Sequence, residues 1–153
     1  RQAHNPIYND DIIYTPAVTV FKTDTEQPEI MNASDWYDVD VITCAAPNLR
    51  VQNNYNGKSS YNNAKKMTND ELLKLHEKRL KRILDTALSE DDETIILGAF
   101  GCGAFMNDPQ IVAQVAKNVI REYLYSFKNI EFAVYCSPRD DRNYRIFDRV
   151  LKK

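Results

Sequence analysis

Three of the four glycines in the sequence fall close together, at Gly98, Gly101 and Gly103. They follow a short apolar run and precede Asp108-Pro109, a pair typical of a helix start. In open α/β sheets, ligands bind at the carboxyl ends of the strands, and glycines let backbone amides approach an anion closely. The helix adds the positive end of its dipole. The loop therefore predicts a binding site for a phosphate or a diphosphate; the alternative is a tight strand-to-helix turn that binds nothing.

The glycine spacing, G-x-x-G-x-G, is neither the Rossmann G-x-G-x-x-G nor a Walker loop, because no Lys-Ser or Lys-Thr follows it. Phe100 and Phe105 flank the glycines, and aromatic faces beside a phosphate suit a ribose or a base. The alternative for one of the two is packing in the core. Asn143, after the last predicted strand, is a candidate for the adenine side of a nucleotide. The alternative there is a helix that docks on the core through Tyr144 and Phe147.

Cys102 lies between two of these glycines, a position that would suit a nucleophile on a sharp turn. A thiolate nucleophile needs a base or a cation beside it, and the sequence places neither His4 nor His76 near this cysteine. We therefore expect the amide of Cys102 to matter more than its sulfur. Together with Cys44 and Cys136, it gives no pair or cluster with metal-binding spacing. We expect no metal and no cofactor, and reduced thiols in a cytoplasmic protein.

Apolar patterning predicts the order strand, strand, helix, strand, helix, strand, helix, which is typical of a sheet covered by helices on its two faces. Thr68 and Glu71 form a capping box at the start of the first helix, and Pro16 makes the first strand an edge strand or irregular. We interpret the basic run of that helix, Lys74, Lys78, Arg79, Lys81 and Arg82, as a solvated face. Strands are expected over residues 12–21, 39–46, 94–97 (buried throughout) and 130–136, a mobile polar loop over 53–66, and helices after Thr68, after Asp108 and over 144–151.

The composition is that of one soluble globular domain, which we assign to residues 1–153. Apolar residues make up 43% and charged residues 27% of the sequence. The net charge of −2 provides no basic field, so we expect no nucleic-acid partner. No run approaches the roughly 20 apolar residues of a membrane helix, so we expect no membrane association.

Several segments, taken in order, resemble one known family. The loop Ile96–Phe105 followed by Asn107-Asp108-Pro109 is the most specific of them, and Thr43–Asn48 is similar to a strand and turn of the same family. Tyr14–Phe21 and Ile130–Val134 fit in the same order. On these residues the chain resembles the C-terminal portion of the microbial-type poly(ADP-ribose) glycohydrolases, which belong to the macrodomain superfamily.

The resemblance implies an α/β fold, a macrodomain-like three-layer α/β/α arrangement with a mixed sheet, here without its N-terminal strands. It implies hydrolysis of the ribose–ribose O-glycosidic bonds of poly(ADP-ribose), with ADP-ribose or the polymer as partner. Phe105 would help to position the distal ribose. The residues implied to contact the diphosphate and the distal ribose are Gly98, Ala99, Phe100, Gly101, Cys102, Gly103, Ala104 and Phe105.

The sequence departs from the family pattern in one respect, because it contains no triple-glycine loop followed by Gln-Glu-Glu. Glycosidic cleavage needs a carboxyl acid that protonates the leaving oxygen, and we assign no residue of this chain to that role. We therefore expect a part of a longer hydrolase that is inactive alone and can self-associate through an exposed sheet edge. The alternatives are a short, non-catalytic binding module for ADP-ribose or a similar nucleotide diphosphate, and an unrelated α/β phosphate-binding domain.

Overall fold

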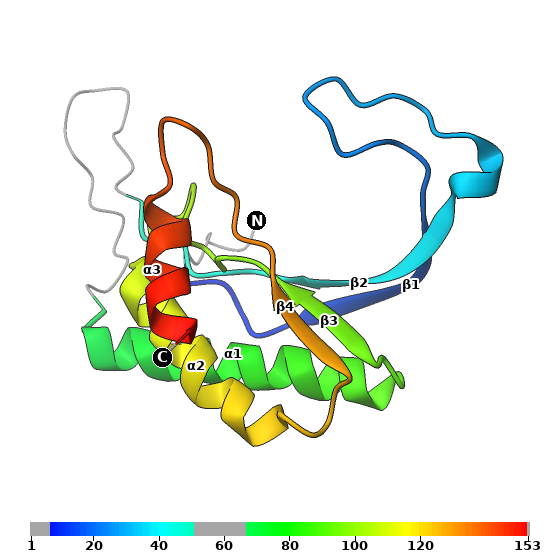
Figure 1. The fold of residues 1–153 in the computed structure, drawn as a ribbon. Helices are drawn as coiled ribbons and strands as arrows, with labels where there is room; N and C mark the ends of the chain where they lie inside the picture. Colours follow the sequence, from blue (N-terminus) through cyan, green and yellow to red (C-terminus); the bar gives the residue numbers. More distant parts are fainter. Residues whose placement is uncertain (1–6, 51–66, 153) are drawn as a thin grey trace, which may run out of the picture.

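The computed structural model describes residues 7–50 and 67–152, so the predicted loop over residues 53–66 lies outside the described residues (Figure 1). The order of strands and helices is the predicted one, with a short 3-10 helix added between the first two strands. The elements are β1 (Ile12–Val20), η1 (Ala33–Asp35), β2 (Tyr37–Cys44), α1 (Asn69–Ser89), β3 (Thr94–Leu97), α2 (Pro109–Tyr123), β4 (Asn129–Phe132) and α3 (Arg142–Leu151). The mixed α/β class is confirmed.

Strands β1 and β2 form an antiparallel pair with a bulge. The register shifts between Thr15 and Val18, which leaves Pro16 and Ala17 as the bulged residues. The carboxylate of Asp40, on β2, accepts a hydrogen bond from the Ala17 amide at 2.7 Å. Proline has no amide hydrogen to give to a strand ladder, so the irregularity expected at Pro16 takes the form of this bulge.

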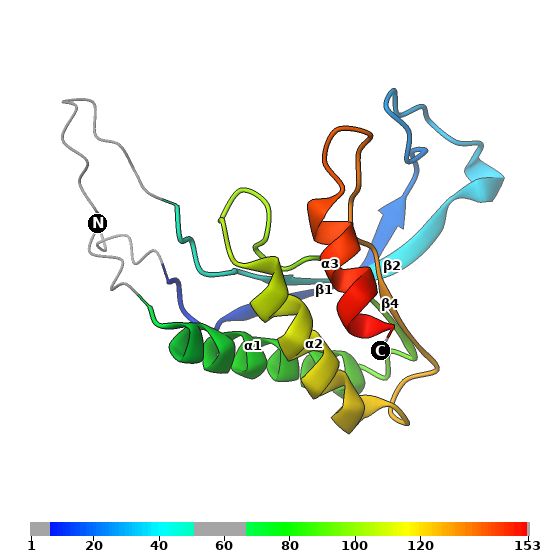
Figure 2. The same ribbon diagram turned by 60° about the vertical axis from the view of Figure 1, so that its left-hand side comes forward.

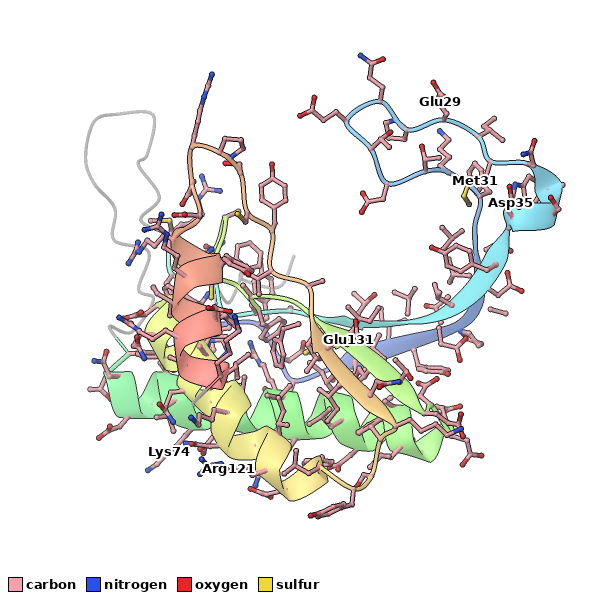
Figure 3. The ribbon with its side chains drawn as sticks, viewed as in Figure 1. Glu29, Met31, Asp35, Lys74, Arg121 and Glu131 are labelled. Atoms are coloured by element: carbon pink, nitrogen blue, oxygen red, sulfur yellow. The ribbon has the colours of Figure 1, made fainter. Side chains whose placement is uncertain are left out.

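Strands β3 and β4 form a second, parallel pair, in which Ile95 lies opposite Ile130 and Ile96 opposite Glu131. The expectation that β3 is buried along its whole length is wrong, because Ile95 is buried but Ile96 is 66% exposed. Glu131 is exposed as well (Figure 3). The reason is the period of a strand: alternate side chains face opposite sides, and only one side of β3 and β4 is covered by described residues.

The helices pack on one face of the strands (Figures 1 and 2). One buried cluster joins α1 and α2 to both sheets, and a second joins α2 and α3 to β4 and to the segment after β3. The first cluster contains Ile83, Leu84, Ala87, Ile95, Val115, Val119 and Phe127. The second contains Val112, Ala113, Phe147 and Val150. The described part of the chain thus supplies one sheet layer and one helix layer.

Helix α1 begins as predicted, because Thr68 accepts from the Glu71 amide and the Glu71 carboxylate accepts from the Thr68 amide. The solvated basic face is confirmed at Lys74, which points away from the sheet (Figure 3). It is wrong at Arg79, which is only 1% exposed. Arg79 is buried because it lies on the apolar stripe of α1, seven residues after Leu72.

The connection between β1 and β2 projects beyond the helices and carries Glu29, Met31 and Asp35 (Figure 3). Among the described residues, no helix is both long enough and apolar enough to cross a membrane.

Candidate functional site

The glycine loop is the segment of residues 98–107 between β3 and the start of α2, and it folds back on itself. The Cys102 amide donates to the Ala99 carbonyl at 3.0 Å, and the Asn107 amide donates to the Gly101 carbonyl at 3.1 Å. A further turn joins the Met106 amide to the Gly103 carbonyl at 3.0 Å. These hydrogen bonds within the loop form part of what gives it a defined shape.

Gly101 is the position at which this shape requires glycine. Its φ is +76°, in the left-handed region that other residues rarely adopt. A Cβ at this position would lie 2.5 Å from Nδ2 of Asn107 and 2.7 Å from Cβ of Ala46. Gly103 differs, because a Cβ there would have no atom within 4 Å. Gly101 therefore shapes the loop, whereas Gly103 faces open space where a ligand can approach.

Several amides of the loop have no hydrogen-bond acceptor within the described part of the chain, which indicates an anion site. To the residues that the structure describes, the amides of Gly103, Ala104 and Phe105 donate no hydrogen bond. They precede α2, where Asp108 caps the helix by accepting from the Gln110 amide at 2.9 Å. Loop amides without a partner attract phosphates, and the positive end of the α2 dipole follows these three residues in the chain. The arrangement can therefore bind a phosphate group through the backbone alone.

A buried pair of hydrogen-bonded polar side chains holds the end of the loop in place. Asn107 and His76 are each 2% exposed, and Nε2 of His76 lies 3.0 Å from Oδ1 of Asn107. Nδ2 of Asn107 donates to the carbonyls of Pro47, at 2.8 Å, and Gly101, at 3.0 Å. Because Nδ2 faces carbonyl oxygens, Oδ1 must face His76, and Nε2 of His76 must carry the hydrogen. Helix α1, the turn after β2 and the glycine loop thus meet at one asparagine.

The segment that resembles the family's strand and turn, Thr43–Asn48, runs directly against the loop. Ala46 and Pro47 are buried, and the Leu49 amide donates to the Phe105 carbonyl at 2.9 Å. This backbone hydrogen bond, just after the strand-and-turn motif, joins two segments that lie about fifty residues apart in the sequence.

The two phenylalanines of the loop have different surroundings. Phe100 packs against the second core cluster, and its ring lies nearly perpendicular to that of His76 at a centroid distance of 5.7 Å. Phe105 instead stacks on Tyr8, with centroids 6.0 Å apart and planes inclined by 29°. Core packing, which was the alternative for one of the two, therefore applies to Phe100. Phe105 is the aromatic that lies beside the open amides.

Cys102 does not have the surroundings of a nucleophile. Burial, followed by the negative charge of Asp108, raises the pKa of its thiol to about 12, although Arg142 acts in the opposite direction. The thiol is therefore protonated at neutral pH, and its sulfur contacts the Phe100 carbonyl. Within residues 7–50 and 67–152, no group of three or more His, Cys, Asp or Glu side chains could hold a metal ion.

Asn143 lies in the first turn of α3 and is half-buried. The same helix docks on the second core cluster through Phe147, and the loop residues Ala99, Phe100 and Cys102 pack against that cluster. The start of α3 and the glycine loop are therefore neighbours in space. Tyr144 is 46% exposed, so the docking expected for this helix rests on Phe147 rather than on both aromatic residues.

A cavity of about 710 Å³ extends from the loop between β2 and β3. Gly98, Ala99 and Phe100 line one part of it, and Asp40 and Asp92 line another. The described strands β2 and β3 do not pair with each other, so the sheet is open where the cavity lies. The glycine loop is therefore continuous with a larger, mainly apolar hollow.

Sequence reasoning missed three residues that shape this site: His76, Arg79 and Tyr8. His76 and Arg79 follow Leu72 by four and seven residues, so helical spacing places both on the apolar face of α1. That spacing was a usable signal of burial. Tyr8 gave no comparable signal, because it lies in a polar, turn-like segment before the first strand.

Comparison with known proteins gives matches among solved structures. The poly(ADP-ribose) glycohydrolase of Deinococcus radiodurans in complex with ADP-ribose matches with a TM-score of 0.81 and 28% identity, over 99% of this chain and 56% of that one. Its apo form gives 0.80 and 28%, over 99% and 57%. The chain resembles the C-terminal portion of the bacterial poly(ADP-ribose) glycohydrolases.

The glycohydrolase of Thermomonospora curvata matches as well, with a TM-score of 0.71 and 26% identity over 95% of this chain and 49% of that one. The chain therefore spans about half the length of the glycohydrolases that it matches. Neither a protein-family model nor a curated protein sequence matches it. The resemblance expected from the sequence motifs is confirmed, and because the match covers nearly the whole chain it includes the glycine loop.

Proposed function

We propose that the glycine loop binds the diphosphate of ADP-ribose, and that the chain is the ADP-ribose-binding part of a poly(ADP-ribose) glycohydrolase. The observation that carries this proposal is the set of amides at Gly103, Ala104 and Phe105, which lie in the loop just before the Asp108 cap of α2 and donate no hydrogen bond to described residues. The matched Deinococcus radiodurans enzyme has been crystallised with ADP-ribose, which supports this choice of ligand.

The surroundings of the loop suggest how the ligand would lie. Phe105 offers a ring at one end of the amide row, where we propose that the distal ribose packs. Asn143, in the first turn of α3, offers an amide side chain for the adenine side. The rest of the loop, from Gly98 to Cys102, would line the diphosphate, although the amides of Phe100 and Cys102 already donate to the carbonyls of Gly98 and Ala99.

Hydrolysis of a glycosidic bond also requires a carboxyl acid at the site. Asp108 follows the loop directly, but it caps α2. Burial and the charge of Asp40 raise the pKa of Asp92, as an acid would need, but Asp92 precedes β3 and so lies at the opposite end of that strand from the loop. We therefore propose that the acid comes from a Gln-Glu-Glu segment, which this sequence does not contain.

The same observation favours a second candidate function, a binding module that holds ADP-ribose without cleaving it. Two measurements on the chain separate the possibilities. Calorimetric titration with ADP-ribose, with AMP and ATP as controls, tests the ligand, and selective binding of ADP-ribose is expected. Incubation with poly(ADP-ribose) tests the reaction, and release of ADP-ribose would contradict our assignment of the acid to residues outside this sequence. Preference for AMP or ATP would contradict the choice of ligand.

A further inference from the structure

The segment before β1 is tied to α1 by one buried side chain. Nη2 of Arg79 donates to the Ile7 carbonyl at 2.7 Å, and Nη1 donates to the Ala45 carbonyl, after β2, at 2.8 Å. Nε of Arg79 lies 3.1 Å from the Asp10 carboxylate. The guanidinium presents its donors in a fixed planar fork, so contacts in several directions fix the segment in one place.

Tyr8 is held by this segment in a conformation that it would not adopt readily. Its φ is +58°, in the left-handed region that bulky residues rarely occupy. The Arg79 contacts on both sides of it, at Ile7 and at Asp10, offset that strain. The result is that the Tyr8 ring stacks on Phe105, at a centroid distance of 6.0 Å.

Phe105 is thereby fixed twice. The Leu49 amide holds its backbone carbonyl at 2.9 Å, and Tyr8 limits where its ring can turn. Phe105 is only half-buried, so its ring is not enclosed by the core on all sides. Its orientation beside the open amides therefore depends on a residue almost one hundred positions earlier in the sequence.

We propose that Tyr8 is a positioning residue that orients Phe105 toward the distal ribose, and so determines the preference of the site for ADP-ribose over ADP. This inference rests on the proposed function, since it assumes that ADP-ribose occupies the glycine loop. Arg79 acts one step further away, by holding Tyr8 in place. The aromatic ring of Tyr8 carries the role and its hydroxyl group does not, because the contact with Phe105 is ring on ring.

Calorimetric titration of the unmodified chain, Tyr8→Ala and Tyr8→Phe with ADP-ribose and with ADP tests this inference, because ADP lacks the distal ribose. Tyr8→Ala is expected to weaken ADP-ribose binding about three- to tenfold, the range for one aromatic pair, and to leave ADP binding unchanged. Tyr8→Phe is expected to bind both ligands as the unmodified chain does. The control is Tyr125→Ala, which removes a fully exposed tyrosine just after α2 and should change neither affinity.

Each other outcome has a definite meaning. Equal loss of both ligands in Tyr8→Ala, no loss at all, or failure of Tyr8→Phe to restore binding would overturn the role of the ring. If circular dichroism shows that Tyr8→Ala does not fold, Tyr8→Leu keeps the apolar bulk without the ring and should show the same selective loss. An unmodified chain that binds ADP-ribose no better than ADP would overturn the proposed function, and this inference with it.

Discussion

Nε2 of His76 lies 3.0 Å from Oδ1 of Asn107, and this buried contact joins the middle of α1 to the end of the glycine loop. Asn107 uses its other polar atom for the carbonyls of Pro47 and Gly101. Loss of His76 would therefore leave a buried acceptor without its donor at the point where three segments meet.

Replacement of His76 by alanine is expected to destabilise the chain by about 2–4 kcal/mol, because it leaves Oδ1 of Asn107 unsatisfied and opens a cavity. The free energy of unfolding, from urea titration, measures the effect. Lys74→Ala is the matched control, since it removes an exposed side chain of the same helix and should change stability by less than about 0.5 kcal/mol. Equal effects of the two substitutions would contradict the role of the buried contact.

Stability is expected to fall as the pH drops below about 6.5. Burial lowers the pKa of His76 below its ordinary 6.5, and Arg79 acts in the same direction, while the hydrogen bond with Asn107 opposes them. Above that pH the imidazole is neutral in the folded and the unfolded chain. Below it the unfolded chain binds a proton that the folded chain does not, until the lowered pKa is reached. The loss is at most about 1.4 kcal/mol per pH unit.

Urea unfolding of the chain and of His76→Gln, from about pH 7.5 to about pH 5, measures this loss. The difference in slope between the two isolates His76, because His4 is present in both. The carboxylate of Asp10, whose pKa the hydrogen bond from Lys78 lowers from 3.8, acts in a lower pH range and does not interfere. Identical slopes for the two proteins would show that the pKa of His76 is the same in the folded and the unfolded chain.

Substitution of two glycines of the same loop is expected to have opposite consequences. Gly101→Ala should destabilise the fold by at least about 2 kcal/mol, because the new Cβ would overlap Asn107 and Ala46 at a positive φ. Gly103→Val should leave stability nearly unchanged but abolish ADP-ribose binding, since its side chain would fill the space in which the ligand approaches. Thermal unfolding and calorimetric titration of both variants test this pair, and unchanged affinity in Gly103→Val would contradict the assignment of the loop.

The three cysteines are expected to react at different rates with iodoacetamide near neutral pH. Cys136 is exposed and should be modified first, whereas burial raises the pKa of both Cys44 and Cys102 and protects them. Mass spectrometry of the modified chain gives the order. Cys102→Ser should retain ADP-ribose affinity, and fast alkylation of Cys102 would instead restore a nucleophilic role for its thiol.

The features that the sequence predicted well depend on neighbouring residues. The capping box of Thr68 and Glu71 and the Asp108-Pro109 start of α2 form within a few residues, so their patterns suffice to locate both helices. The glycine loop was recognisable for the same reason. Its shape was not, because it depends on Asn107 contacts to Pro47 and His76, which come from distant parts of the chain.

Arg79 shows why the remaining errors occurred. A basic residue among four others on a helix is usually solvated, but this one donates to carbonyls from two other segments and pairs its charge with Asp10. Only the folded chain brings those carbonyls together. The position of Tyr8 was unpredictable for the same reason, since its contact with Phe105 depends on where Arg79 holds its segment.

Three contacts between described residues hold the glycine loop in place. Asn107 bonds with His76, the Leu49 amide donates to the Phe105 carbonyl, and Tyr8 stacks on the ring of Phe105. Such a loop gives up its conformational freedom when the chain folds, before any ligand arrives. If the loop binds a diphosphate as proposed, the ligand has little ordering left to impose, so more of the energy of its contacts appears as affinity. Recognition at this site is in that sense prepared by folding, and a variant that loosens the loop should bind with a larger entropic penalty even where every contacting amide remains.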